Sequence, residues 1–199
     1  MQKLFKIIIF LAACSLLALL PCNTALAEPS ADILRHSLET RYTVIRYQSV
    51  EDLEKFNRKI DYSPGQLGFM QMFSRSSSKD LTGEITKKVD AVYERVQNIL
   101  GMRKKTKKIT INIYSNDKQL YAFYLKHKDT AFRNFSSSTR LRAWYIHKNN
   151  TIYVNSTDLH AGMLAHEIAH AVIDHYLLIR PPTATAEILA RYVDSHLLF

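Results

Sequence analysis

Cysteine is scarce in this 199-residue chain, which contains only Cys14 and Cys22. Both lie before Ala27, where the sequence Ala25-Leu26-Ala27 matches the small-residue pattern of a secretory cleavage site. Cleavage at that point would remove both thiols. We therefore expect a mature chain with no disulfide and no thiol nucleophile, whose stability depends on side-chain packing.

The chain also lacks an apolar run long enough to span a bilayer. The stretch from Ile7 to Leu20 is almost wholly apolar, but it is shorter than the roughly 18–20 residues of a membrane span, and Pro21 ends it. Lys3 and Lys6 supply the positive start that precedes such a stretch in an export signal. We therefore expect no stable membrane span once the signal is removed.

These features predict a signal peptide over residues 1–27 and a single domain over residues 28–199, exported to the periplasm or secreted. A chain of that length is long enough for one domain with a hydrophobic core. The sequence Leu11-Ala12-Ala13-Cys14 resembles a bacterial lipobox. Lipid anchoring at Cys14 is therefore the alternative to a freely exported chain.

Several motifs of common enzyme classes are absent, including the G-x-S-x-G elbow, the P-loop and internal repeats. The formal net charge is +9, and five of its cations lie in the run Arg103 to Lys108. Without interleaved aromatic residues, this run is poor evidence for nucleic acid, and we expect no nucleic-acid partner. It is either a solvated turn or a contact for anionic envelope polymers or acidic substrates.

Residues His166 to His170 form an H-E-x-x-H motif within an apolar-rich run. Residues four apart on a helix share one face, with Cβ atoms about 5–6 Å apart, so both imidazoles can reach one metal ion at about 2.0–2.1 Å. Glu167 points about 100° around the helix, beside the ion, where it can accept a proton from water. The motif indicates a zinc-dependent hydrolase, and the alternative is a chance match on an ordinary amphipathic helix.

The flanks of the motif also indicate a helix. Ser156, Thr157 and Asp158 offer oxygens for an N-cap. Apolar and motif residues then recur at steps of three and four from Leu159 to Leu177, until a Pro-Pro pair stops the run.

Zinc hydrolases generally use three protein ligands and leave a fourth position for water. One extended motif requires a glycine and a third histidine downstream, but Ile173 and Tyr176 occupy those positions. Glu187 follows the Pro-Pro turn, in a segment that fits an antiparallel helix returning its first turn to the metal. An ordinary surface pair with Arg191, four residues further on, is the competing role for Glu187.

The segments H-E-I-A-H-A-V-I-D-H-Y, beginning at His166, and E-I-L-A-R-Y-V, beginning at Glu187, resemble the gluzincins, and specifically the minimal peptidase-MA-like or minigluzincin proteins. The resemblance implies one zinc ion per chain, held by His166, His170 and Glu187. It also implies that Glu167 is the general base of a metallopeptidase. Such an enzyme hydrolyses peptide bonds with zinc-activated water.

Two roles around this site stay open. Asp174 and Asp194 are candidates for orienting a histidine ligand, or they are solvated surface carboxylates. Tyr192 and Tyr176 are the nearest candidates for stabilising the oxyanion, or they are plain core aromatics. His196 lies nine residues after Glu187, about 180° around that helix, so it should face away from the metal.

The hydrophobic pattern predicts an α+β fold. Strands are expected over residues 42–48, 109–114, 143–147 and 152–155, helices over 50–60 (capped by Ser49), 80–100 and 118–126, an irregular stretch through 74–78, and a loop over 129–141. The motif helix and a closing C-terminal helix follow a small mixed sheet, an order that resembles zincins. That resemblance implies that residues 143–147 form the exposed edge along which an extended peptide substrate lies.

We therefore expect an exported zinc metallopeptidase with a peptide or protein substrate. The alternatives are a catalytically inactive zinc-binding envelope protein and an adaptor that binds a partner through its basic surface and exposed edge. The intact Glu167 argues against a purely structural zinc site, which would fill its fourth position and need no base beside it.

Overall fold

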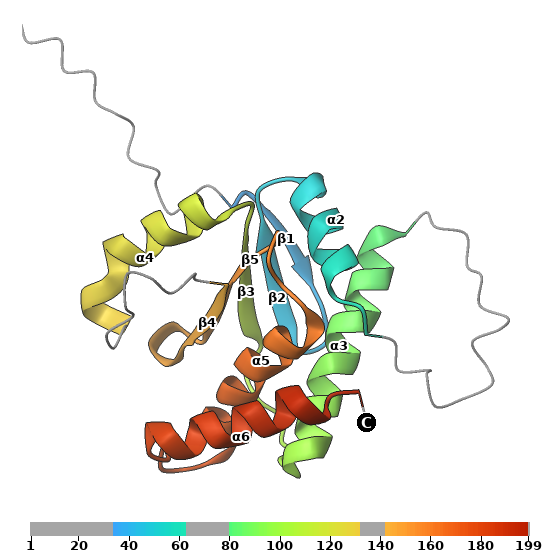
Figure 1. Ribbon diagram of the computed structural model, residues 1–199. Coiled ribbons are helices and arrows are strands. Elements are labelled where there is room, and N and C mark those ends of the chain that lie inside the picture. Colours follow the sequence, from blue (N-terminus) through green and yellow to red (C-terminus); the bar gives the residue numbers. More distant parts are fainter. Residues whose placement is uncertain (1–33, 63–79, 132–141, 199) are drawn as a thin grey trace, which may run out of the picture. The chain divides into compact units, whose positions relative to one another are not determined.

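The computed structural model describes residues 34–62, 80–131 and 142–198, without the side chains of residues 126–131. The described elements belong to residues 31–199, which form a compact unit. With the labels of Figure 1, they are β1 (His36–Glu39), β2 (Thr43–Tyr47), α2 (Val50–Lys59), α3 (Leu81–Leu100), β3 (Ile109–Tyr114), α4 (Asp117–Ala131), β4 (Ala143–Ile146), the 3-10 helix η3 (His147–Asn149), β5 (Thr151–Asn155), α5 (Ala161–Tyr176) and α6 (Thr183–His196).

The strands form one mixed sheet in the order β1-β2-β3-β5-β4. The inner strands β2, β3 and β5 run parallel, and β1 and β4 pair antiparallel with their neighbours. This mixed sheet with its helices confirms the predicted α+β fold. Within the described part of the chain, β4 has no strand on its outer side, so it lies at the expected edge.

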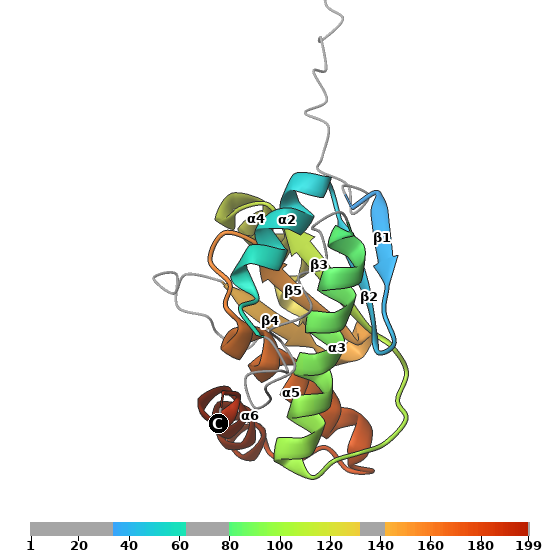
Figure 2. The same ribbon diagram turned by 90° about the vertical axis from the view of Figure 1, so that its right-hand side faces the viewer.

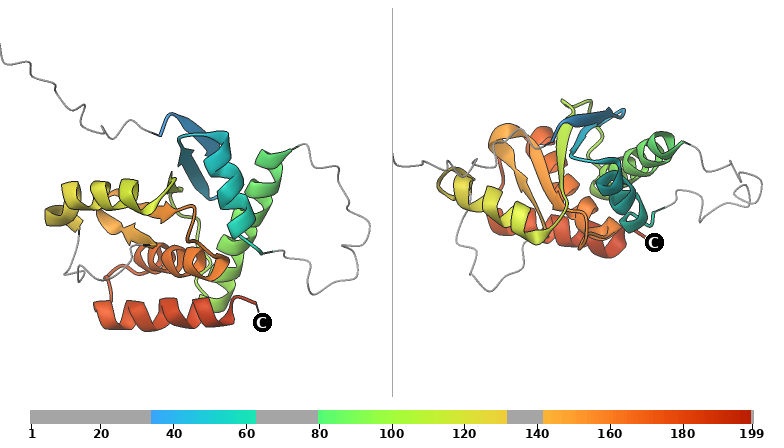
Figure 3. Two further views of the ribbon diagram at one scale, coloured as in Figure 1. Left: turned by 45° about the horizontal axis from the view of Figure 1, so that its top comes forward. Right: turned by 90° about the horizontal axis from the view of Figure 1, so that it is seen from above.

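Helices cover both faces of the sheet. Strand β3 alternates, so that Ile109, Ile111 and Ile113 join the main core formed with α2, α3 and α5. The opposite face carries a smaller aromatic cluster, in which Tyr153 and Trp144 pack under α4. Figure 2 shows α3 crossing the sheet, and Figure 3 shows α4, the sheet, α5 and α6 following one another as layers. Helix α6 is therefore the outermost layer beside α5.

Local sequence signals account for several element ends. The hydroxyl oxygen of Ser49 accepts a hydrogen bond from the Asp52 amide at 3.2 Å and caps α2, as predicted. The Asp80 carboxylate caps α3 in the same way. Gly101 ends α3 in the left-handed conformation, with φ of 64°, which a residue without Cβ adopts at little cost.

Other elements differ from the prediction. Strand β1 is absent from the sequence prediction, because its exposed residues show no alternation and its pairing with β2 supplies the order. Helix α4 continues to Ala131, beyond the predicted end at residue 126. The expected edge over 143–147 ends at Ile146, because His147 begins the 3-10 turn.

Some predictions lie outside the described residues. These are the signal peptide over residues 1–27 with Cys14, the irregular stretch through 74–78, and residues 132–141 of the loop expected over 129–141. Among the helices that the structure describes, none has the length and apolar character needed to cross a membrane. The basic run after α3 is described, and it connects a helix to a strand as expected.

Candidate metal centre

The motif lies on a hairpin of two antiparallel helices, α5 and α6. Both helices carry small buried residues, Ala165 and Ala169 on α5 and Ala186 and Ala190 on α6. At Gly162 the Asp194 side chain comes close, since a Cβ atom there would lie 2.0 Å from Oδ1 of Asp194. This glycine therefore allows α6 to approach the first turn of α5, which the sequence pattern did not reveal.

The start of α5 differs from the sequence prediction. His160 is the N-cap, and its Nδ1 accepts a hydrogen bond from the Met163 amide at 3.2 Å. The predicted caps Ser156, Thr157 and Asp158 lie earlier, in the turn after β5. There the side-chain Oδ1 of Asn155 accepts hydrogen bonds from the backbone amide and the hydroxyl of Thr157, so these polar groups serve the turn and not the helix.

His166, His170 and Glu187 are brought together by this hairpin. The Nε2 atoms of the two histidines lie 3.2 Å apart. Oε2 of Glu187 lies 3.6 Å from Nε2 of His166, and Oε1 lies 3.3 Å from Nε2 of His170. Among the residues described, these three form the group of potential ligands whose donor atoms all lie within 4.8 Å of one another.

This spacing fits a tetrahedral zinc ion. Ligands at about 2.0–2.1 Å from a tetrahedral centre lie about 3.3–3.4 Å from one another. The two Nε2 atoms, 3.2 Å apart, and the shortest contacts of the carboxylate, 3.3 Å from Oε1 to His170 and 3.6 Å from Oε2 to His166, lie close to that value. With one donor atom taken from each residue, the three atoms lie within 4.8 Å of one another. Two imidazole nitrogens and a carboxylate are also a usual catalytic zinc donor set. The residues present therefore fit the metal that the sequence resemblance implies.

The histidines are also held in the form that binds metals. Burial lowers the pKa of His166, although the charge of Glu187 opposes this shift. Burial lowers the pKa of His170 as well, and the neighbouring His166 adds to the effect. Neutral imidazoles offer a lone pair, so metal binding at neutral pH requires little proton release from them.

Glu187 lies against the histidines and not in the surface pair that competed with this role. Its ion-pair contacts are with His166 and His170, and its side chain is less than half exposed. Helix α6 begins at Thr183, directly after the Pro-Pro pair, so Glu187 occupies the second turn and not the predicted first turn.

Glu167 lies beside this group and contacts the edge strand. The backbone of Tyr145 in β4 forms a hydrogen bond with its carboxylate, which lowers the pKa of Glu167. Burial, helped by the charge of Glu187, outweighs that bond and raises the pKa to about 8. A cation bound by Glu187 and the histidines would oppose this rise, because it favours the charged carboxylate.

Both predicted outer residues act on the histidines electrostatically, Asp194 on His166 and Asp174 on His170. The backbone of Ala190 forms a hydrogen bond with His166, an outer contact that the sequence did not indicate. The Asp174 carboxylate also lies 3.0 Å from His147 and 3.0 Å from Arg180, which tie it to the end of β4 and the α5–α6 connection.

The predicted oxyanion candidates face elsewhere. Tyr192 lies five residues after Glu187, about 140° around the helix, and stacks on His196. Half of its surface is exposed. Tyr176 ends α5, more than one turn beyond His170, and is also exposed. His196 contacts Ser195 on its own helix, consistent with its predicted direction away from the metal.

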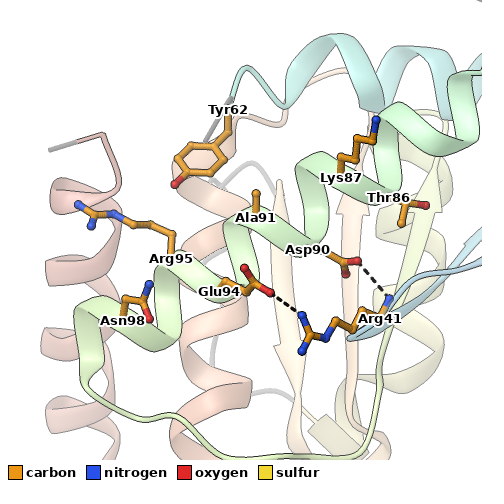
Figure 4. A pocket seen from close by; sticks show the side chains of 9 residues that line it. All are labelled: Arg41, Tyr62, Thr86, Lys87, Asp90, Ala91, Glu94, Arg95 and Asn98. Atoms are coloured by element: carbon orange, nitrogen blue, oxygen red, sulfur yellow. Dashed lines mark hydrogen bonds and ion pairs between the residues drawn. The ribbon is translucent and has the colours of Figure 1, made fainter. Parts of the chain in front are cut away.

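A separate pocket of about 480 Å³ lies on the outer face of α3 (Figure 4). Several of its charged groups contact one another. The Arg41 guanidinium pairs with Glu94 at 3.1 Å, and the Arg41 backbone amide donates a hydrogen bond to the Asp90 carboxylate at 3.2 Å. None of the four predicted site residues lines this pocket.

The fold and the site together define an α+β protein that carries a two-histidine, one-glutamate candidate metal centre on a helical hairpin. Comparison of the chain with protein-family models, with curated proteins and with solved structures finds no match.

Proposed function

We propose that this protein is an exported zinc metallopeptidase of the gluzincin type. His166, His170 and Glu187 are the proposed zinc ligands, and Glu167 is the proposed general base. The observation that carries the proposal is the convergence of the donor atoms of His166, His170 and Glu187 within 4.8 Å of one another, with the Glu167 carboxylate beside them. A purely structural site has no use for that fourth group.

The proposed chemistry divides between the metal and the chain. Zinc held by three protein ligands acts as a Lewis acid, which makes water acidic enough to react near neutral pH and polarises a peptide carbonyl. Glu167 accepts the proton of the attacking water and donates it to the departing amine. The Tyr145 backbone holds the Glu167 carboxylate, which fixes the base between the edge strand and the ligands.

The proposed substrate site is the free edge of β4. The Arg142 carbonyl accepts a hydrogen bond from Asn155 in β5, so residues 142, 144 and 146 face β5. The backbone groups of Ala143 and Tyr145 then face outward. Because the Tyr145 backbone already contacts Glu167, an extended peptide would pair chiefly with Ala143 and continue towards the base.

One observation favours a second candidate, a zinc-binding envelope protein without catalysis. Tyr192 stacks on His196, and both Tyr192 and Tyr176 are exposed, so we assign neither of them to a developing oxyanion. The substitution Glu167→Gln separates the two candidates. If Glu167 is the base, this variant retains zinc and loses activity by about 10²–10⁴-fold.

The test combines zinc analysis with digestion of a broad peptide library. The matched control is Glu54→Gln, which makes the same chemical change on the exposed side of α2. It should retain the activity of the unsubstituted protein. Equal inertness of the unsubstituted protein and the Glu167→Gln variant, with zinc bound to both, would reject the peptidase and favour the non-catalytic candidate.

A further inference from the structure

The connection between α5 and α6 exposes two large apolar side chains at its tip. Leu178 is 99% exposed and Ile179 is 86% exposed. Figure 1 shows this connection at the lower left, where α5 ends and α6 begins. Exposed apolar residues are common singly, but two adjacent and almost fully exposed ones on a projecting turn indicate an interaction site.

Cations surround this tip. Arg180 follows it directly and keeps more than half of its side chain exposed while it contacts Asp174. Lys107 acts electrostatically on His175, which places the basic run after α3 near the end of α5. Lys104, Lys105 and Lys107 are exposed along that run. The nearby carboxylate, Asp174, is almost fully buried between its two partners, so the accessible charge of this region is positive.

The size of the patch helps to identify the occupant. A stable protein interface buries about 800 Å² on each partner, with 20–30 residues a side, whereas the tip offers two apolar side chains. A bilayer needs no such area, because apolar residues enter the acyl boundary while cations contact the phosphates. Tyr176, partly exposed just before the tip, is of the type enriched at that interface.

We propose that the α5–α6 tip docks on an anionic lipid surface, with Leu178 and Ile179 inserted and the basic run against the phosphates. Arg180 at the tip acts electrostatically on His170, so docking would hold the candidate metal centre near the bilayer. The inference does not depend on the proposed peptidase activity, because lipid binding is measured without turnover.

The experiment measures sedimentation of residues 28–199 with vesicles of equal parts phosphatidylcholine and phosphatidylglycerol. This chain contains the whole compact unit, and circular dichroism verifies that each variant is folded. The double substitution Leu178→Ser with Ile179→Ser should weaken binding by about tenfold or more, since it removes the inserting groups. Replacing Lys104, Lys105 and Lys107 by Gln should also weaken binding and reduce its dependence on salt.

The matched control removes two exposed apolar residues elsewhere, Val50→Ser with Leu125→Ser, and should bind as the unsubstituted protein does. Four results of the vesicle experiment overturn the proposal. They are no binding of the unsubstituted protein, equal binding to phosphatidylcholine alone, equal loss in the control, and a folded tip variant with undiminished binding. Concentration-dependent dimers that the tip substitutions abolish would overturn it as well, by assigning the tip to a second copy.

Discussion

At the scale of single residues, Glu187 is the position on which the candidate metal centre depends. The two histidines share a helix face by their spacing alone, whereas Glu187 comes from another helix and reaches both of their Nε2 atoms. Its carboxylate also acts on the proposed base, because its charge helps to raise the pKa of Glu167. Removing that charge is expected to affect metal binding before it affects folding.

We predict that Glu187→Gln lowers zinc affinity by at least about 100-fold, which exceeds the 10–100-fold typical of outer contacts. The amide keeps the size of the side chain but removes the anionic ligand. Isothermal titration with zinc measures the effect. Arg191→Gln is the control, since Arg191 lies one helical turn away and has no ion-pair contact with Glu187. If a folded Glu187→Gln variant binds zinc with unchanged affinity, Glu187 is not a zinc ligand.

At the scale of elements, the Asp194 side chain of α6 lies against Gly162 in the first turn of α5. We predict that Gly162→Ala lowers the free energy of unfolding by up to about 2 kcal/mol. Alanine favours a helix by about 1 kcal/mol, but overpacking costs about 1–3 kcal/mol, and the added Cβ would meet the Asp194 carboxylate.

Urea denaturation measures this change. In an Asp194→Ala background the obstacle is gone, so Gly162→Ala should become neutral or stabilising. Stabilisation of equal size in both backgrounds would show that Asp194 does not set the distance between the helices.

The edge strand permits a second test at this scale. Ala143→Pro removes an amide that faces away from β5 and leaves the pairing of Trp144 with Tyr153 in place. We expect a higher KM for peptide substrates and unchanged zinc content. Tyr145 is unsuitable for this purpose, because its backbone also contacts Glu167. Unchanged kinetics in a folded Ala143→Pro variant would place the substrate elsewhere.

At the scale of the whole molecule, α6 is attached to the rest of the fold unevenly. Its C-terminal end is tied to α3, because Arg95 donates to the carbonyls of His196 and Leu197. Its N-terminal half contacts α5 through Glu187 and buried alanines. A metal ion would therefore join this half of α6 to the core.

We predict that chelation of zinc lowers the Tm by about 5–10 °C. A ligand at 100 times its Kd adds about 2.7 kcal/mol, and each kcal/mol shifts the Tm of a domain of this size by about 2–4 °C. Calorimetry measures the shift, and hydrogen exchange should rise more in α6 than in β3. His166→Ala should show no response to the chelator. If protein shown to bind zinc has the same Tm with and without chelator, the metal does not stabilise the hairpin.

The sequence by itself determined what depends on local periodicity. The step of four between His166 and His170 places them on one face of any helix, and alternation along residues 109–114 places the isoleucines on one face of a strand. The caps Ser49 and Asp80 act within three residues of their own positions. These features follow from backbone geometry, which neighbouring residues specify.

The tertiary structure decided what depends on distant segments. It placed Glu187 against the histidines, stacked Tyr192 on His196, and brought the Tyr145 backbone to Glu167. It also made Gly162 a point of helix contact. No regular spacing of residues in the sequence predicts these contacts. Each depends on how one helix or strand packs against another element of the chain.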